Sequence, residues 1–388
     1  MNVSAPEITR TAQGVRYTVQ VRDTLRTQPA TLWYEVPAEF ADFVSTQSDA
    51  ALVGLLMSAM STGEPIHLEG RVSRQLLSNL GEAHQSMLRQ VVPSLRPVQI
   101  SATNVTEERH PNAQAVITGY SGGIDSLATL LRPRAADEPT ITHLAHHNVG
   151  GHGSGAKAAE VFRLRLERAR GAARRLGRPL IGVDSNLHDF AGPKTGFMST
   201  HTFCNVSAML VLQAGVGTYE YSSAHHIRDQ VIKDNGDISR IDNLALHLLS
   251  TESMKVRLSG ENYTRLEKLR LIVEDPIVRD LLDVCIRPRE AAGRTNCSRC
   301  LKCMRAQLSL ELLGRLEEFG AVFDLRTYRK MRTLQIAHLL KGQLPPPDEV
   351  KNFLLGSGLP IPAWSRFYAR PIIFPLAKAW HKLRLRLP

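Results

Sequence analysis

Residues 121–126, Ser-Gly-Gly-Ile-Asp-Ser, carry the clearest signal for chemistry in the chain. They follow an apolar stretch of strand character and open a helical stretch. Two glycines allow a sharp turn whose N–H groups point inward, and the helix N-terminus adds its positive dipole end. Ser121 and Ser126 add hydroxyl donors, so the loop predicts a cradle for an anion of pyrophosphate size. The alternative is a tight turn whose glycines serve geometry only.

Charged side chains extend this interpretation. The carboxylate of Asp125 would repel bare phosphate unless a cation lay between them, so Mg²⁺ bound with a nucleotide is its natural partner. Arg265 and Lys268 lie three residues apart on a predicted helix and therefore share a face. Two cations on one face suit the phosphates of ATP, or charge that develops at the α-phosphorus. A solvated helix with salt bridges to Glu261 and Glu267 is the alternative.

Cysteines supply the second signal, because four of the five in the chain are Cys285, Cys297, Cys300 and Cys303. Two successive Cys-x-x-Cys spacings let three thiolates converge from one turn and the start of a helix, and Cys285 completes a tetrahedron. Four sulfurs without an open position predict a structural Zn²⁺ site. A [4Fe–4S] cluster accepts the same ligands, and unliganded thiols are the third alternative. Five cysteines in so long a chain exclude a disulfide scaffold.

The elements around the glycine loop alternate between strand and helix. Strand patterns lie at 115–119, 141–145, 180–183 and 218–222, and helical patterns lie at 156–176 and 203–213. This alternation predicts parallel pairing with right-handed crossovers, and hence an α/β fold with an open, doubly wound sheet.

Two further stretches flank this alternation. The preceding residues predict a small α+β domain, with strands at 15–21 and 31–36, an extended segment at 64–69, and helices at 48–60 and 73–92. From residue 243 onward the pattern is mostly helical.

At the glycine loop and the cysteines, the chain resembles a known superfamily. The loop is similar to the Ser-Gly-Gly-x-Asp-Ser signature of PP-loop (N-type) ATP pyrophosphatases, and the cysteines look like those of 7-cyano-7-deazaguanine synthase-like proteins. The resemblance covers roughly residues 114–310 and implies an adenine nucleotide alpha hydrolase-like sheet. It also implies that the pyrophosphate of ATP and its Mg²⁺ are bound by Ser121, Gly122, Gly123, Asp125 and Ser126.

The resemblance further implies an activity. Such enzymes cleave ATP between the α and β phosphates and adenylate an oxygen of the substrate, and a nucleophile then attacks the activated carbon. We expect an AMP- and pyrophosphate-forming ligase that adenylates a carbonyl or carboxylate oxygen of a small molecule for attack by nitrogen, with Asp125, Arg265 and Lys268 as catalytic residues.

Two other functions fit the same residues. Sulfur insertion into a nucleobase, free or in tRNA, is the alternative enzyme, with Cys204 either as sulfur carrier or as a packed thiol. A nucleotide-binding partner module without turnover is the alternative outside enzymes.

Several segments differ from the synthase pattern. His-His-Asn-Val-Gly-Gly-His at 146–152 stands where the synthases carry Asp-Tyr-Gly-Gln, and residues 202–205 and 222–226 replace their substrate segments. A deazaguanine substrate is therefore not implied. His225 and His226 end a predicted strand, at the edge where parallel sheets bind ligands, and are candidates for substrate binding or proton transfer. Loop histidines without a role are the alternative, and the same two interpretations apply to the histidines at 146 and 147.

The chain thus divides into four predicted segments. They are an α+β domain at 1–110, a PP-loop ATP-binding domain at 111–242, a helical region with the zinc site at 243–349, and a basic aromatic tail at 350–388. The tail holds seven Lys and Arg and no acid, so an acidic partner, RNA or a membrane surface fits it.

Composition limits the class of protein. In 388 residues, 43% apolar and 22% charged side chains exclude disorder, and the net charge of +11 favours an anionic partner. The chain starts without the pattern of a secretory signal, and no apolar run is long enough to span a bilayer, so we expect a cytoplasmic protein. A homo-oligomer is among the open alternatives for its assembly.

Overall fold

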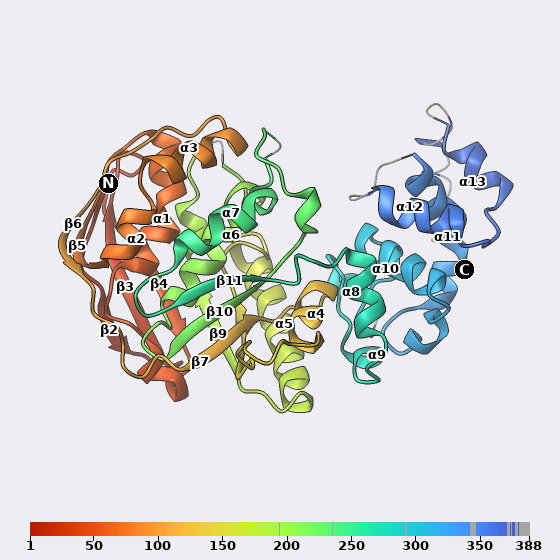
Figure 1. Cartoon of the computed structure of the whole chain (residues 1–388), viewed down its shortest axis with the longest axis horizontal. Helices are drawn as coiled ribbons and strands as arrows, with labels where there is room; N and C mark the ends of the chain where they lie inside the picture. Colours follow the sequence, from red (N-terminus) through yellow and green to blue (C-terminus); the bar gives the residue numbers. More distant parts are fainter. Residues whose placement is uncertain are drawn as a thin grey trace. The chain divides into compact units, whose positions relative to one another are not determined.

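The computed structural model describes residues 1–193, 195–234, 236–291, 293–341 and 347–370, with Ile373, Pro375, Leu376 and Ala379. The chain folds into two compact units (Figure 1). The first is Met1–Ser121 with Pro133–Asn262, and the second is Gly122–Arg132 with Tyr263–Pro388.

The first unit is built on a mixed sheet. Its eleven strands among the described residues are β1 (Asn2–Val3), β2 (Glu7–Arg10), β3 (Val15–Arg22), β4 (Ala30–Val36), β5 (Ile66–Ser73), β6 (Ile100–Thr106), β7 (Ala115–Gly119), β8 (His143–His147), β9 (Leu180–Ser185), β10 (Val216–Ser222) and β11 (Lys255–Ser259). The order is β11-β10-β7-β8-β9-β4-β3-β1-β5-β6, with β2 paired to β3. Strands β7 to β11 pair in parallel. The α/β class, with a mostly parallel sheet, is therefore confirmed.

Helices of the first unit lie beside this sheet. They are α1 (Asp49–Thr62), α2 (Arg74–Asn79), α3 (Glu82–Val91), α5 (Gly155–Arg175), α6 (Phe197–Leu210) and α7 (Asp242–Ala245). Helix α6 begins six residues earlier than expected, because the Ser199 hydroxyl and the backbone of Gly196 close its first turn. The helix predicted at 73–92 is two helices, which are interrupted at Leu80 and Gly81.

The N-terminal strands continue the α/β sheet. Strand β4 pairs antiparallel with β9, with Tyr34 opposite Ser185. Helix α1 packs against α6, and the Tyr34 hydroxyl lies 2.5 Å from that of Ser207 on α6. The four predicted segments and the two observed units therefore divide the chain differently, because residues before 110 share one core with those after it.

Strand β11 is the exception, among the described residues, to the mostly helical pattern expected after residue 243. Residues Lys255–Ser259 pair in parallel with β10, with Tyr219 opposite Val256. The hydrogen-bonding partner of this strand lies more than 30 residues earlier in the sequence, so no local pattern reveals it.

The second unit is helical in its described residues. Its helices are α4 (Ile124–Leu131), α8 (Arg265–Ile272), α9 (Val278–Leu281), α10 (Leu301–Leu312), α11 (Leu325–Leu340), α12 (Pro347–Gly356) and α13 (Ala363–Tyr368). The Ser365 hydroxyl donates to the Thr333 carbonyl (2.9 Å), so this part of the basic tail packs on α11. Its four later cations, Lys378, Lys382, Arg384 and Arg386, lie outside the described residues. Among the described helices, none is long and apolar enough to cross a membrane.

Candidate functional site

The glycine loop enters α4 through a conformation that requires glycine. Gly122 has a φ of +72°, and a Cβ atom there would lie 3.1 Å from the Leu281 carbonyl oxygen. The Asp283 N–H donates to the Gly122 carbonyl (2.8 Å), and the Ser126 hydroxyl donates to the Gly123 carbonyl (3.0 Å). Ser121, at the end of the first unit's segment, is exposed. The turn is therefore sharp, and hydrogen bonds to the carbonyl groups of Gly122 and Gly123 hold it in this conformation.

Asp125 lies in the first turn of α4, and both of its carboxylate oxygens face cations of α8. Arg265 Nη1 is 3.0 Å from Oδ2, and Lys268 Nζ is 3.6 Å from Oδ1. The Lys268 side chain is 2% exposed, so its charge is compensated inside the protein. The structure thus brings together the three residues that were predicted to be catalytic.

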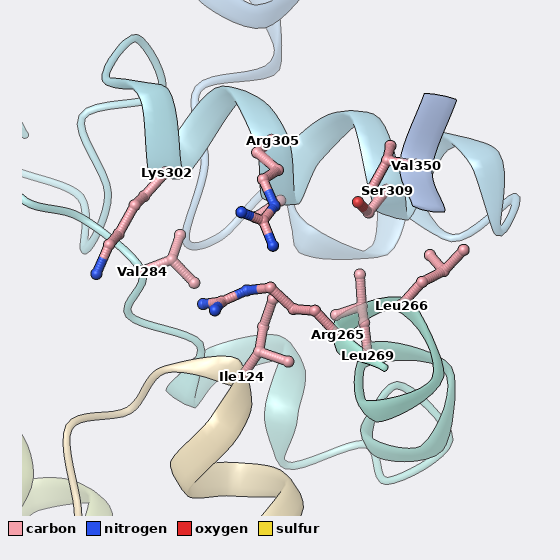
Figure 2. A pocket seen from close by; sticks show the side chains of 10 residues that line it. Ile124, Arg265, Leu266, Leu269, Val284, Lys302, Arg305, Ser309 and Val350 are labelled. Carbon is pink, nitrogen blue, oxygen red and sulfur yellow. The ribbon is translucent and has the colours of Figure 1, made fainter. Parts of the chain in front are cut away.

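A small cavity of about 50 Å³ adjoins this group and is lined by α4, α8 and α10. Arg305 and Lys302 of α10 line it together with Arg265 and Ile124. Figure 2 shows the guanidinium group of Arg305 directed toward that of Arg265. Sequence reasoning missed Lys302 and Arg305, although they lie three residues apart on one helix beside the cysteine cluster, a spacing that signals a shared face.

The electrostatics of this cavity favour an anion. Burial would raise the pKa of Asp125, but Arg265, Lys268, Arg305 and Lys302 outweigh it and hold that pKa below its ordinary value, so the carboxylate is charged. Burial and the charge of Arg265 lower the pKa of Arg305 to about 9. Two guanidinium groups that face each other repel, and a bound anion between them would relieve that repulsion.

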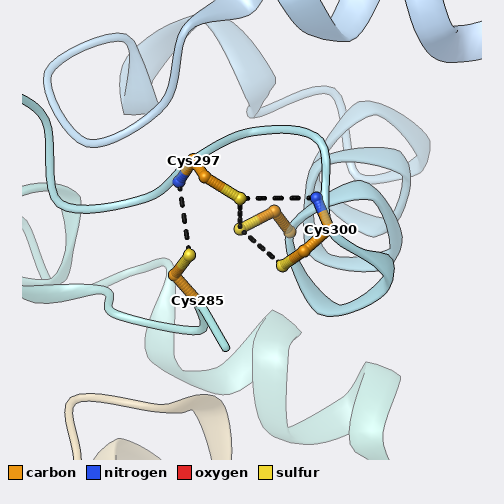
Figure 3. Close-up of side chains that lie close together, drawn as sticks. Cys285, Cys297 and Cys300 are labelled. Atoms are coloured by element: carbon orange, nitrogen blue, oxygen red, sulfur yellow. Dashed lines mark hydrogen bonds between the residues drawn. The ribbon is translucent and has the colours of Figure 1, made fainter. Parts of the chain in front are cut away.

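The four predicted metal ligands also converge, in the second unit. The Sγ atoms of Cys285, Cys297, Cys300 and Cys303 all lie within 4.8 Å of one another, and all four residues are buried. Figure 3 shows the sulfurs of Cys297 and Cys300 turned toward the same point, with Cys285 opposite. Cys300 and Cys303 have Sγ atoms 3.3 Å apart, and those of Cys297 and Cys303 are 3.9 Å apart.

These separations suit a tetrahedral zinc ion. Zn–S bonds of about 2.3 Å place the sulfurs of a tetrahedron about 3.8 Å apart. Backbone N–H groups of Arg287 and Cys297 point at the Cys285 sulfur at 3.2 and 3.4 Å, as donors to a thiolate do. The four buried cysteines therefore fit a metal ion such as Zn²⁺.

Polar side chains shape the chain around the cysteines. The Asn296 side chain accepts from the Val284 N–H (2.9 Å) and donates to the Leu282 carbonyl (2.8 Å). These bonds join the segment before Cys285 to the turn that carries Cys297. Ser298 has a φ of +59°, and its hydroxyl accepts from the Asp324 N–H at 2.7 Å. Hydrogen bonds of the surrounding residues therefore help to hold the four cysteines in place.

Two histidines of the first unit, His146 and His147, lie at the carboxyl end of β8. His147 Nε2 lies 3.0 Å from Asn205 Oδ1, and His146 Nδ1 lies 2.8 Å from the Tyr120 carbonyl oxygen. Burial lowers the pKa of His146 to about 4, so this imidazole is neutral at physiological pH.

The two predicted substrate histidines follow β10 in the same unit. His225 Nε2 lies 3.4 Å from Asp237 Oδ2, and His226 Nδ1 accepts from the Arg228 N–H at 3.0 Å. Burial would raise the pKa of Asp237, but the hydrogen bonds from His225 and Ser239 lower it to about 2. His226 thus caps a short turn, and His225 is held by a carboxylate.

A buried carboxyl group, Asp242, makes the stability of the first unit depend on pH. The Thr202 hydroxyl donates to Oδ1 (2.8 Å), whereas Oδ2 has no hydrogen-bond partner. Burial raises the pKa of Asp242 from 3.8 to about 7. Between these values the folded state holds a proton that the unfolded state has lost, so the free energy of unfolding falls as pH rises from about 4 to 7.

An Asp242→Asn variant should lose this dependence. Relative to the variant, we expect the wild type to lose on the order of 2 kcal/mol between pH 5 and pH 8, measured by urea unfolding. Asp137→Asn, at an exposed position of the same unit, is the control and should follow the wild type. Parallel pH profiles for wild type and Asp242→Asn would show that the carboxyl group is ionised throughout.

Comparison of the chain with known proteins finds no similar protein. The chain matches no protein family, no curated protein and no solved structure. The function therefore has to be inferred from the residues and geometry above.

Proposed function

We propose that the protein is an ATP-dependent, AMP- and pyrophosphate-forming ligase of PP-loop type, which adenylates a carbonyl or carboxylate oxygen of a small molecule for attack by nitrogen. The observation that carries the proposal is the group around Asp125, where Arg265 and Lys268 pair with the carboxylate and Arg305 faces the same cavity. Three elements thereby direct one acid and several cations to one place.

Each member of this group has a role in the proposed reaction. Asp125 is the anionic ligand through which Mg²⁺ would reach the phosphates, because Mg²⁺ prefers carboxylate and phosphate oxygens. Arg265 and Lys268 hold that carboxylate and offer donors to the leaving pyrophosphate. Charge that develops on the phosphates is stabilised by such preorganised cations. The cavity is about 50 Å³, so it accommodates part of a phosphate chain rather than a whole nucleotide.

Strand order supports a doubly wound sheet of this kind. Strand β7 lies between β8 and β10, so the chain runs to one side through β8 and β9 and to the other through β10 and β11. In open parallel sheets, ligands bind outside the carboxyl ends of the strands where the order reverses. The glycine loop starts at Ser121, two residues after the last residue of β7, Gly119.

The four cysteines have a supporting role in the proposal. Helix α10 begins directly after Cys300 and carries Cys303 as well as Lys302 and Arg305. Zinc at the cysteines would hold the start of this helix, and with it the two cations, in one position. It would act as a structural ion, because four thiolates leave no open coordination site.

The sulfur-insertion alternative gains no support from Cys204. Burial raises the pKa of this thiol to about 11, whereas a sulfur carrier works as a thiolate. The nitrogen ligase is therefore the function that the residues favour.

The products of ATP test the proposal directly. Incubation with ATP, Mg²⁺, ammonia and a panel of carboxylic acids should yield AMP and pyrophosphate, detected by ³¹P NMR. ADP and phosphate as the sole products would overturn it.

An Arg305→Met variant should bind pyrophosphate about 10- to 100-fold more weakly than the wild type in calorimetry, because it loses one charged donor to the anion. Arg329→Met is the matched control, since Arg329 pairs with Glu317 at the surface of the same unit and should leave the affinity unchanged. Equal affinities for wild type and Arg305→Met would remove this residue from the anion site.

A further inference from the structure

Helix α13 packs on α11 with one face and exposes another to solvent (Figure 1). Its Ser365 is fully buried, and Tyr368 and Ala369 pack against methionine and leucine side chains of α10 and α11. The other face carries Trp364 and Phe367, which are 63% and 38% exposed. Their rings meet edge to face, with centroids 5.7 Å apart. The helix thus presents a pair of aromatic rings to solvent.

Cations accompany these rings. Arg366 and Arg370 are exposed, and the Arg370 guanidinium lies over the Phe367 ring, 5.4 Å from its centroid. The whole tail at 350–388 contains seven Lys and Arg and no Asp or Glu. Helix α11, on which α13 packs, also contains no acid. The rings therefore belong to a part of the chain whose ionised side chains are all cations.

Aliphatic side chains follow in the sequence. Residues 371–376, Pro-Ile-Ile-Phe-Pro-Leu, contain no polar side chain, and the described residue Leu376 is 69% exposed. Single apolar side chains are common on protein surfaces, whereas several of them close together and bordered by charge mark an interaction site. We define the α13 surface as Trp364, Arg366, Phe367 and Arg370.

The mixture of side chains on and after this surface identifies its partner. Tryptophan and arginine suit the boundary between lipid headgroups and acyl chains, because each combines an apolar body with a polar end that stays hydrated. A second copy of the chain would bring the same cations face to face, and these repel. RNA would attract the cations and stack on the rings, but an aliphatic side chain such as that of Leu376 cannot stack on a base. An anionic membrane accommodates all three kinds of side chain.

We propose that the α13 surface binds an anionic phospholipid membrane, with Trp364 and Phe367 among the headgroups and with Arg366 and Arg370 at the lipid phosphates. Such attachment is peripheral, and its strength comes from buried apolar area together with attraction between cations and headgroups. The proposal does not depend on the proposed adenylation, because none of these four residues lines the cavity beside Asp125.

Vesicle flotation of the full-length protein tests lipid binding. The protein should float with vesicles of phosphatidylcholine and phosphatidylserine but not with phosphatidylcholine alone, and added NaCl should weaken binding because it screens the charges. Trp364→Ser should lower the partition coefficient about tenfold, since a large apolar side chain no longer leaves water. Leu25→Ser is the matched control, because Leu25 is a 44% exposed apolar residue of the first unit, and it should bind like the wild type.

The two arginines are tested by a separate variant. Arg366→Gln combined with Arg370→Gln should weaken binding to the anionic vesicles about 25-fold, or about fivefold for each cation near the membrane surface. Arg10→Gln combined with Arg22→Gln removes the same charge from exposed positions of the first unit and should bind like the wild type.

Fluorescence tests whether Trp364 itself enters the lipid. The chain has three tryptophans, Trp33, Trp364 and Trp380, so a variant with Trp33→Phe and Trp380→Phe reports on Trp364 alone. Vesicles with brominated acyl chains should quench its emission. Circular dichroism checks that each variant folds, and this measurement tests the contact should Trp364→Ser fail to fold.

Three results would overturn the proposal. They are no flotation of the wild type with anionic vesicles, flotation that both the Trp364 and the arginine variants leave unchanged, and emission from Trp364 that brominated lipid does not quench. In the first case, binding of single-stranded oligouridine that the arginine variant loses would assign the surface to RNA. A dimer in sedimentation velocity that Trp364→Ser abolishes would assign it to a second copy. AMP formation, measured separately and without vesicles, tests the proposed ligase and is unaffected by these results.

Discussion

An Asp125→Asn variant should form AMP and pyrophosphate about 10²- to 10³-fold more slowly than the wild type, the range seen when one electrostatic contact in a transition state is lost. Asparagine keeps the shape of the side chain but removes the charge that faces Arg265 and Lys268 at 3.0 and 3.6 Å. It also removes the carboxylate that would hold Mg²⁺ beside the phosphates. Initial rates of pyrophosphate release at saturating ATP and Mg²⁺ measure the effect.

Stability must be measured beside activity in this variant. Lys268 is 2% exposed and would be left without its carboxylate, so we expect Asp125→Asn to lose about 1–3 kcal/mol of unfolding free energy. Glu317→Gln is the control, since Glu317 is exposed and pairs with Arg329 in the same unit. It should change the free energy of unfolding by less than about 0.5 kcal/mol and leave the rate unchanged. A folded Asp125→Asn protein with wild-type rates would contradict the role given to this carboxylate.

Among the substitutions considered for the second unit, loss of one of its four clustered cysteines should have the largest effect. In a Cys303→Ser variant we expect less than one equivalent of zinc, fewer helical residues and no detectable AMP formation. Cys303 is fully buried in the first turn of α10, the helix that carries Lys302 and Arg305. Structural zinc contributes about 10–16 kcal/mol of apparent binding free energy in zinc-finger peptides, so an ion held by the four thiolates would stabilise this helix strongly. Metal analysis and circular dichroism provide the readouts.

The fifth cysteine supplies the control for this experiment. Cys204 belongs to α6 of the first unit, so Cys204→Ser should retain the metal and the helical signal. If the proposed nitrogen chemistry is correct, it should also retain AMP formation, whereas a sulfur carrier at this position would make the variant inactive. Full zinc in Cys303→Ser would refute the four-thiolate site. Iron and inorganic sulfide in stoichiometric amounts would identify a [4Fe–4S] cluster instead of zinc.

The predictable parts of this protein are those with a local cause. Two Cys-x-x-Cys spacings place three thiols on one turn whatever surrounds them, and the structure brings Cys285 to the same point. The spacing of Arg265 and Lys268 likewise puts them on one face of α8, as expected. Strands β3 and β4 follow from their alternation of apolar and polar side chains, which the burial pattern reproduces.

The parts that could not be predicted depend on distant partners. Arg305 faces Arg265 only because α10 packs near α8, and no spacing within residues 300–305 reveals which helix will lie opposite. The pairing of β4 with β9 is of the same kind, since the paired Glu35 and Asp184 are 149 positions apart in the sequence.

That pairing also protects the chain from self-association. Without β4, the end of β9 at Asp184 and Ser185 would present unpaired N–H and C=O groups on its outer edge. Exposed edges of this kind template the addition of strands from other chains and lead to aggregates. A truncation that began near residue 111 to isolate the parallel strands would therefore create an unpaired strand edge that favours aggregation. The N-terminal strands cover this edge, so shorter fragments made for expression should include them.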